Sequence, residues 1–252
     1  MRAKYDDVKV HKVMKIRLFT IPNIITLANL LSGVLASIVT LQYHNYTLAL
    51  MLVVLAAVFD FFDGFVARLL NQQSPLGVQL DSLADDVTFG LVPALVMFDI
   101  YNHTPSYYGC DCAVMEYLGY LTLLIAAFSV LRLAKFNIDT TQSTEFSGLP
   151  TPANALLLLS LAMLFERGDI MLYREHVLLI SVAMSLLLIS PIRMFALKFK
   201  GFGWRGNELR YLFILASLLI IIFATKYAVA IIITLYIVVS TLIWLFTKRE
   251  VE

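Results

Sequence analysis

The stretch VFDFFDGFVARLLNQQSPLGVQLDSLADD, residues 58 to 86, decides how the rest of the chain is interpreted. It places Asp60, Asp63, Asp81 and Asp85 inside a chain that is otherwise strongly apolar. Of the 252 residues, 60% are hydrophobic and 15% are charged, and the mean hydropathy is +0.82. Soluble domains are about 45 to 50% apolar. The composition therefore indicates an integral membrane protein.

Apolar runs of about 20 residues, the length that spans a bilayer, predict an all-α, polytopic membrane bundle of about eight transmembrane helices. The runs lie at 21 to 43, 47 to 70, 76 to 101, 117 to 136, 151 to 166, 175 to 197, 209 to 225 and 227 to 246. Six or seven transmembrane helices are the alternative, because the fifth run is short and the last two runs are barely separated. We expect Pro191 to kink the sixth helix.

Basic residues are distributed unevenly around these runs. With the N-terminus in the cytoplasm, all but three of the 19 Lys and Arg residues fall on the inner side; the exceptions are Arg167, Arg174 and Lys226. The positive-inside rule therefore predicts that both termini are cytoplasmic. The predicted organisation is an amphipathic or simply basic segment at 1 to 20, one transmembrane domain at 21 to 246, and a cytoplasmic tail at 247 to 252. The scattered basic residues disfavour a nucleic-acid partner.

The four aspartates are predicted to converge. On a helix that advances about 100° per residue, Asp60 and Asp63 share one face. Asp81 and Asp85 are four residues apart and share a face of the next predicted helix. Because the connection between the two helices is only a few residues long, we expect antiparallel neighbours with both acidic pairs at similar depth. The sequence therefore predicts one acidic cluster below the cytoplasmic surface.

Such a cluster needs positive charge nearby. Each Asp at the centre of a bilayer costs on the order of 3 kcal/mol, and four unneutralised carboxylates repel one another. Arg68 alone cannot balance them, whereas one or two divalent cations can, and Mg²⁺ or Mn²⁺ suits carboxylates together with phosphates. Gly64 and Ala67 leave room for a ligand, and the Arg68 guanidinium is suited to phosphate oxygens. A structural ion-pair network or a divalent-cation transporter stays open at this point.

The spacing D-G-x-x-A-R, eight residues, then G-x-x-x-D-x-x-x-D runs from Asp63 to Asp85. It resembles the signature of the CDP-alcohol phosphotransferase family. The segments IPNIITLANLLSG at 21 to 33, LDSLADDVTFGLVP at 80 to 93 and RLAKFNIDTTQSTEFSGLPTPANA at 132 to 155 look like the phosphatidylserine synthase branch of that family. Two departures, Thr88 for the usual Ser and Asn154 for a small residue, bear on the choice of acceptor.

The resemblance implies a function and a set of site residues. The implied reaction transfers the phosphatidyl group from CDP-diacylglycerol to L-serine and releases CMP, in a homodimer at the inner cell membrane with its site facing the cytoplasm. The four aspartates would bind two divalent ions, Mg²⁺ or Mn²⁺, and Asp85 would also act as general base. The implied ligands of the cytidine diphosphate are Asn23, Thr26, Gly64, Arg68, Ser74 and Gly77. For Asn23 and Thr26, helix capping and helix packing stay open as alternatives.

A serine acceptor brings a carboxylate, for which the site needs a cation. Arg132, at the predicted cytoplasmic end of the fourth helix, is our candidate, with Lys135 and Asn137 just beyond it. An Arg whose charged end merely reaches the membrane interface is the alternative. Glycerol 3-phosphate or inositol phosphate as acceptor also stays open, although a phosphorylated acceptor would need more basic residues than this region offers.

Three other features are left without an assigned role. The histidines, His103 included, show no ligand spacing, and Cys110 and Cys112 sit in a polar loop. The segment STEFSGLPTPANA is interpreted as either a substrate-covering loop or a plain connector.

Overall fold

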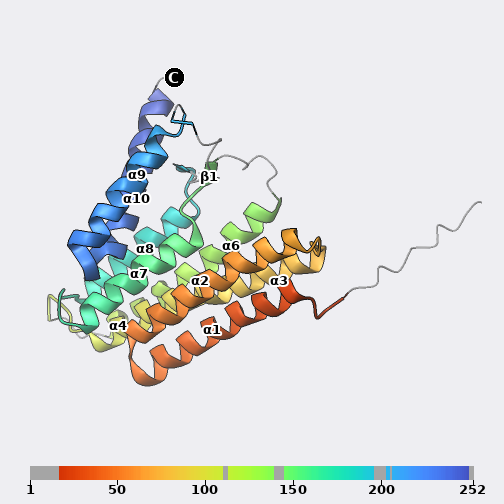
Figure 1. The fold of residues 1–252 in the computed structure, drawn as a ribbon. Helices are drawn as coiled ribbons and strands as arrows, with labels where there is room; N and C mark the ends of the chain where they lie inside the picture. Colours follow the sequence, from red (N-terminus) through yellow and green to blue (C-terminus); the bar gives the residue numbers. More distant parts are fainter. Residues whose placement is uncertain (1–16, 110–112, 139–144, 196–202, 205, 250–252) are drawn as a thin grey trace, which may run out of the picture.

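A computed structural model of the chain describes residues 17–109, 113–138, 145–195, 203–204 and 206–249. These residues form a helical bundle with a short two-stranded antiparallel sheet (Figure 1). In chain order the elements are α1 (Ile21–Tyr43), α2 (Tyr46–Leu69), α3 (Pro75–Asp85), the π-helical turn Asp86–Leu91, α4 (Val92–His103), α5 (Ala113–Leu118), the 3₁₀ turn Gly119–Leu123, α6 (Leu124–Ile138), β1 (Glu145–Ser147), α7 (Thr151–Glu166), α8 (Arg174–Leu188), β2 (Arg193–Phe195), α9 (Glu208–Ala224), the 3₁₀ turn Thr225–Tyr227 and α10 (Ala228–Arg249).

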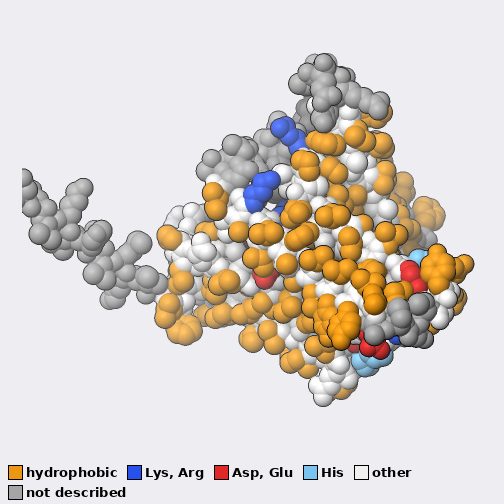
Figure 2. All heavy atoms as spheres, turned by 180° about the vertical axis from the view of Figure 1, so that it is seen from behind, with side chains coloured by type: hydrophobic (Ala, Val, Ile, Leu, Met, Phe, Trp, Pro, Cys, Tyr) orange, Lys and Arg blue, Asp and Glu red, His pale blue; other side chains and the backbone are white. Residues whose placement is uncertain are grey.

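Among the described residues, four helical stretches are long and apolar enough to cross a membrane. They are Ile21–Tyr43, Tyr46–Leu69, Val114–Ile138 and Glu208–Thr247, the last of which contains both α9 and α10. Large apolar side chains are also exposed on the outside of the bundle, and Figure 2 shows hydrophobic side chains spread across the face seen from behind. A surface of this kind is unfavourable in water and fits a lipid environment.

The helical segments fall close to the predicted ones. The α1, α2 and α7 helices match their predicted runs to within one residue at each end. The third run, 76 to 101, is α3 and α4 joined through the π-helical turn, and the fourth is α5 and α6 joined through a 3₁₀ turn. Most of the predicted segment 1 to 20 lies outside the described residues, as do Cys110 and Cys112, and α10 continues into the predicted tail as far as Arg249.

The prediction for residues 175 to 197 is wrong. The α8 helix ends at Leu188, before Pro191, so this proline does not kink a helix. Proline disfavours helical backbone in the residue before it and lacks the N–H that a helix needs, which explains the early end. The apolar run continues as β2, which pairs antiparallel with β1 in the register Phe146↔Met194. The all-α prediction therefore missed this strand pair.

The connection between β1 and α7 is tied to the end of α8. The Gly148 N–H donates to the Ile192 carbonyl at 2.9 Å, and the Leu149 N–H donates to the Leu187 carbonyl at 3.1 Å. Leu149 is fully buried. Gly148 has a φ of +79°, and a Cβ there would lie 2.2 Å from the Leu188 carbonyl oxygen. The described part of this segment therefore favours the fixed connector over the covering loop.

We expect Gly148→Ala to lower the melting temperature of the purified protein in detergent by roughly 4 °C or more, because a left-handed residue gains a Cβ against backbone. Gly168→Ala is the matched control, since Gly168 has a φ of +73° with nothing within 4 Å of its added Cβ. Circular dichroism on heating measures both variants. Equal shifts of the melting temperature in the two variants would show that the contact between Gly148 and the end of α8 does not affect stability.

Candidate active site

The hairpin between α2 and α3 is set by local hydrogen bonds. The Ser74 hydroxyl caps α3 by accepting from the Gly77 N–H at 3.0 Å, and Pro75 occupies the first turn, where its missing N–H costs nothing. Asn71 takes a left-handed conformation, with φ 52°, in the turn that ends α2. The α1 helix packs against both α2 and α3. The acidic faces of the two helices are thereby turned toward the same side of α1.

Three of the predicted acids form a tight cluster. One carboxylate oxygen from each of Asp60, Asp63 and Asp81 lies within 4.8 Å of the others. Asp63 is buried, and its Oδ2 accepts from the Thr26 hydroxyl at 2.5 Å. The Asp81 Oδ1 is buried and has no hydrogen-bond partner among the described residues. Carboxylates this close, one with an oxygen left without a partner, suit a hard divalent cation, so the donor set fits the predicted metal.

Asp85 lies one helical turn beyond Asp81 and is held separately, from α1. The Asn29 amide donates to Asp85 Oδ1 at 3.1 Å, and the Thr88 hydroxyl donates to Asn29 Oδ1 at 2.9 Å. Gly33 allows this approach, because a Cβ there would lie 2.5 Å from the Thr88 hydroxyl oxygen. The chain of contacts from Thr88 through Asn29 orients one oxygen of Asp85.

Sequence reasoning missed Asn29. The available signal was its spacing, because Asn29 follows Thr26 by three residues and therefore lies on the same face of an apolar helix. Asn29 is fully buried, and a buried polar side chain in such a helix needs a hydrogen-bond partner. Its position therefore indicated a contact with the acidic cluster.

A cavity of about 500 Å³ opens beside the acidic cluster, between the start of α1, the end of α2 and the start of α3. It is lined by all six residues predicted to hold cytidine diphosphate, together with two of the acids: Asn23, Thr26, Gly64, Arg68, Ser74, Gly77, Asp63 and Asp81. Gln72 and Gln73 also line it and were not predicted. The arrangement supplies carboxylates at one end and neutral or cationic donors around the rest, as a phosphate-bearing ligand with a bound cation requires.

Asn23 does not cap α1. Thr20 is the cap, and its hydroxyl accepts from the Asn23 N–H at 3.4 Å. The Asn23 amide group donates to the Leu18 carbonyl at 2.8 Å, which leaves its carbonyl oxygen 3.5 Å from where a Cβ on Gly77 would stand. The tighter contact of a Cβ at position 77 would be with the Ser74 hydroxyl oxygen, at 3.3 Å, whereas the distance to Asn23 is an ordinary contact.

A second, smaller cavity of about 230 Å³ lies beside α6. Its lining is Leu131, Arg132, Lys135, Ser147, Leu188 and Ile189. Arg132 is buried, with 9% exposed, which does not fit an Arg that reaches the interface. Its Nη1 donates to Thr151 at 3.4 Å, and its Nε has no hydrogen-bond partner among the described residues. Asp85 lies close enough to interact with it electrostatically.

The other two predicted acceptor residues differ in position. The Lys135 ammonium donates to the Ser147 hydroxyl at 3.3 Å at the rim of the second cavity. Asn137 is not among the residues that line that cavity, and its amide donates to Ser82 on α3 at 2.8 Å. Asn137 therefore ties the end of α6 to α3.

Comparison with known proteins agrees with this geometry. Residues 19–190 match the family model of the CDP-alcohol phosphatidyltransferases, a range that includes the lining of both cavities. The chain belongs to this family. The CDP-alcohol phosphatidyltransferase region runs from the cap of α1 to the end of α8.

Several curated relatives carry the name CDP-diacylglycerol–serine O-phosphatidyltransferase. The protein of Bacillus subtilis (strain 168) is 36% identical over 146 residues, which cover 58% of this chain and 77% of the relative. The protein of Helicobacter pylori (strain ATCC 700392 / 26695) is 29% identical over 238 residues, 93% of this chain and 94% of the relative. The Saccharomyces cerevisiae protein is 32% identical over 177 residues, 63% and 59% of the two chains.

We expect Asp81→Asn to weaken Mn²⁺ binding at least tenfold, because it removes one charged ligand from the three-carboxylate cluster. Electron paramagnetic resonance of free Mn²⁺, titrated into purified protein, measures the affinity. Asp86→Asn is the matched control, since Asp86 stands in the same segment but outside the cluster. A comparable loss in Asp86→Asn, or none in Asp81→Asn, would contradict the assignment.

Proposed function

We propose that this protein is a CDP-diacylglycerol–serine O-phosphatidyltransferase of the inner cell membrane. The observation that carries the proposal is the cavity that Arg68 and polar donors line together with Asp63 and Asp81, while the buried Arg132 interacts electrostatically with Asp85. The names of the relatives support the same donor lipid and the same acceptor. A cation transporter would not need a phosphate-type cavity of this composition.

The larger cavity receives the cytidine diphosphate part of the donor lipid. Gly64 and Gly77 have no side chains that would fill the cavity, and the Arg68 guanidinium binds pyrophosphate oxygens. Asn23, Thr26 and Ser74 supply further polar contacts. Asp60, Asp63, Asp81 and Asp85 would hold two divalent ions, Mg²⁺ or Mn²⁺. When bound, such ions neutralise charge on the pyrophosphate and orient the leaving group.

Asp85 acts as the general base. The serine hydroxyl oxygen forms a bond to the β-phosphorus, the bond from that phosphorus to the bridging oxygen breaks, and CMP leaves with that oxygen. The hydroxyl proton passes to the Asp85 carboxylate. Because Asn29 binds Oδ1 of Asp85, the other oxygen remains for the acceptor.

Arg132 binds the carboxylate of serine. A buried guanidinium with an unused N–H calls for an acceptor, and a carboxylate matches its planar donors. Lys135 stands at the rim of the same cavity, and Asn137 acts indirectly by tying α6 to α3. Two basic residues line this cavity among the described residues, which favours serine over glycerol 3-phosphate or inositol phosphate.

The lipid chains are expected to leave the site sideways into the bilayer. Phe61, Phe62 and Phe65 are exposed on α2 beside the acidic face, and the rings of Phe61 and Phe65 stack at 6.5 Å. We propose about eight membrane-crossing helices, with both termini and the larger cavity on the cytoplasmic side; the distribution of basic residues favours this orientation. We further propose a homodimer that packs through the membrane helices.

The acceptor is tested by incubating the purified protein with CDP-diacylglycerol, Mn²⁺ and a panel of alcohols. We expect CMP release with serine and not with glycerol 3-phosphate or inositol phosphate.

Arg132→Ala should raise the serine KM at least tenfold, because the carboxylate of serine loses its partner. Arg167→Ala, outside both cavities, is the control. Release with glycerol 3-phosphate alone would contradict the proposed acceptor, and an unchanged KM in Arg132→Ala would contradict the role of Arg132.

Asp85→Asn is expected to reduce kcat by about 100-fold or more, because the proton of the serine hydroxyl loses its acceptor. Binding of CDP-diacylglycerol should largely persist, since the other acids and the lining of the larger cavity remain. Stopped assays of CMP and binding of a labelled donor lipid separate the two effects. Near-normal turnover would show that another group takes the proton.

Thr88→Val should lower kcat by roughly tenfold, because the loss of its hydroxyl frees Asn29, which orients Asp85. Thr88→Ser keeps the hydroxyl and should restore turnover to near the original rate. Steady-state kinetics with serine compare the two variants. Equal rates in Val and Ser variants would mean that the hydrogen bond to Asn29 has no part in turnover.

A further inference from the structure

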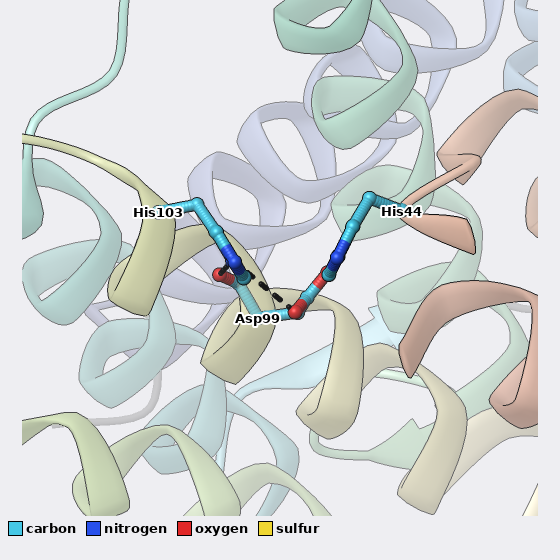
Figure 3. A group of neighbouring side chains, drawn as sticks. All are labelled: His44, Asp99 and His103. Atoms are coloured by element: carbon cyan, nitrogen blue, oxygen red, sulfur yellow. Dashed lines mark hydrogen bonds and ion pairs between the residues drawn. The ribbon is translucent and has the colours of Figure 1, made fainter. Parts of the chain in front are cut away.

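A second cluster of metal-binding side chains lies at the far end of α1. His44 follows the last residue of α1, and Asp99 and His103 stand one turn apart at the end of α4. Figure 3 shows the two imidazole rings reaching toward Asp99 from opposite sides. Thr26, at the acidic site, is 18 residues earlier than His44, or about 27 Å along the helix axis. This cluster is therefore separate from the proposed active site.

Asp99 is a buried carboxylate whose ion-pair partners among the described residues are the imidazoles of His44 and His103. It is 5% exposed, and its Oδ2 accepts from the buried Tyr46 hydroxyl at 2.9 Å. The same oxygen lies 2.8 Å from Nδ1 of His44. Its other oxygen is 3.3 Å from Nδ1 of His103. Within the described part of the chain, no Lys or Arg pairs with this carboxylate. Burial of an anion calls for a compensating cation.

The two histidines are positioned as metal ligands usually are. Metal-binding imidazoles commonly donate a hydrogen bond from one ring N–H to a carboxylate or a backbone carbonyl, which fixes the tautomer and the ring orientation. Nδ1 of His44 lies beside the Asp99 carboxylate, and Nδ1 of His103 lies 2.8 Å from the Asp99 carbonyl oxygen. The ring centroids are 4.4 Å apart, and both side chains are about half exposed. An ion in solution can therefore reach both rings.

The spacing suits an ion of the zinc class. One ligand atom from each of the three residues lies within 4.8 Å of the others. Because Nδ1 of each ring faces an Asp99 oxygen, Nε2 is the nitrogen left for the ion. Two ligands of a tetrahedral ion at about 2.0 to 2.1 Å lie about 3.3 Å apart, so the rings close in on the ion as it binds. Imidazole nitrogens favour Zn²⁺ over Mg²⁺, in contrast to the all-carboxylate cluster at the other end of α1.

We propose that His44, Asp99 and His103 form a second metal site, which takes a borderline divalent ion such as Zn²⁺ through both imidazoles with the Asp99 carboxylate as anionic partner. The bound ion joins the α1–α2 turn to the end of α4. It thereby fixes the far ends of α1, which carries Asn29, and of α4, which follows Asp85 through the π-helical turn. The site does not depend on the proposed transferase activity.

The test is Zn²⁺ binding to the full-length purified protein, free of any histidine tag, in detergent with excess Mg²⁺ present. Competition with a zinc-binding dye measures the affinity, and X-ray absorption reports the number of imidazole ligands. We expect one Zn²⁺ per chain, two imidazoles in its shell, and a higher melting temperature with Zn²⁺ bound. His44→Gln and His103→Gln should each weaken binding at least tenfold.

Two controls separate this site from others. His176→Gln removes an imidazole that lies edge-on to Tyr173 and tilted against Tyr107, outside the cluster, and it should leave Zn²⁺ affinity unchanged. Asp81→Asn alters the acidic site and should also leave it unchanged. His44→Gln and His103→Gln replace half-exposed side chains, so both variants are expected to fold, and their melting temperatures without Zn²⁺ verify this. Unchanged Zn²⁺ affinity in both of these variants, or a loss of Zn²⁺ affinity in Asp81→Asn alone, would overturn the proposal.

Discussion

Four carboxylates inside an apolar helical bundle need a compensating positive charge, and the arrangement of the first three helices serves that need. Among the described residues, none of the four forms an ion pair with Lys or Arg. Thr26 and Asn29 on α1 supply hydrogen bonds to Asp63 and Asp85, which orient the oxygens but do not cancel their charge. The remaining charge is what a divalent cation and a phosphate-bearing ligand would share. The proposed binding site and the structure around it therefore depend on the same acids.

Close helix packing extends this arrangement to the proposed acceptor site. A Cβ on Gly90, in the π-helical turn after Asp85, would lie 2.9 Å from Cβ of Ser129, so α6 approaches this turn closely. Arg132 follows Ser129 by one helical turn and is thereby brought near Asp85. A π-helical turn adds a residue to the usual helical repeat and is frequent at functional sites. Here the π-helical turn contains Thr88, which donates to Asn29, and α4 follows directly after it.

Much of the site was predictable because it is local. The spacing of the aspartates, the helical period and the short α2–α3 connection together require the acidic faces to meet, and the residues around them line one cavity. What sequence reasoning missed depends on contacts between distant residues or on features without a hydropathy signal. Thr88 meets Asn29 across 59 positions, and His44 meets His103 across the same separation. The hydropathy of the apolar run through Met194 is typical of a helix and of a strand alike, so the end of α8 and the β1–β2 pair were not predicted.

The central claim, that the acids of α2 and α3 work by holding divalent cations, is tested most directly by chelation. The purified protein is treated with EDTA, and CMP release from CDP-diacylglycerol and serine is measured as free Mn²⁺ is raised from zero. We predict no turnover in the presence of chelator and recovery of turnover as Mn²⁺ is returned. Full turnover in excess EDTA would contradict the central claim.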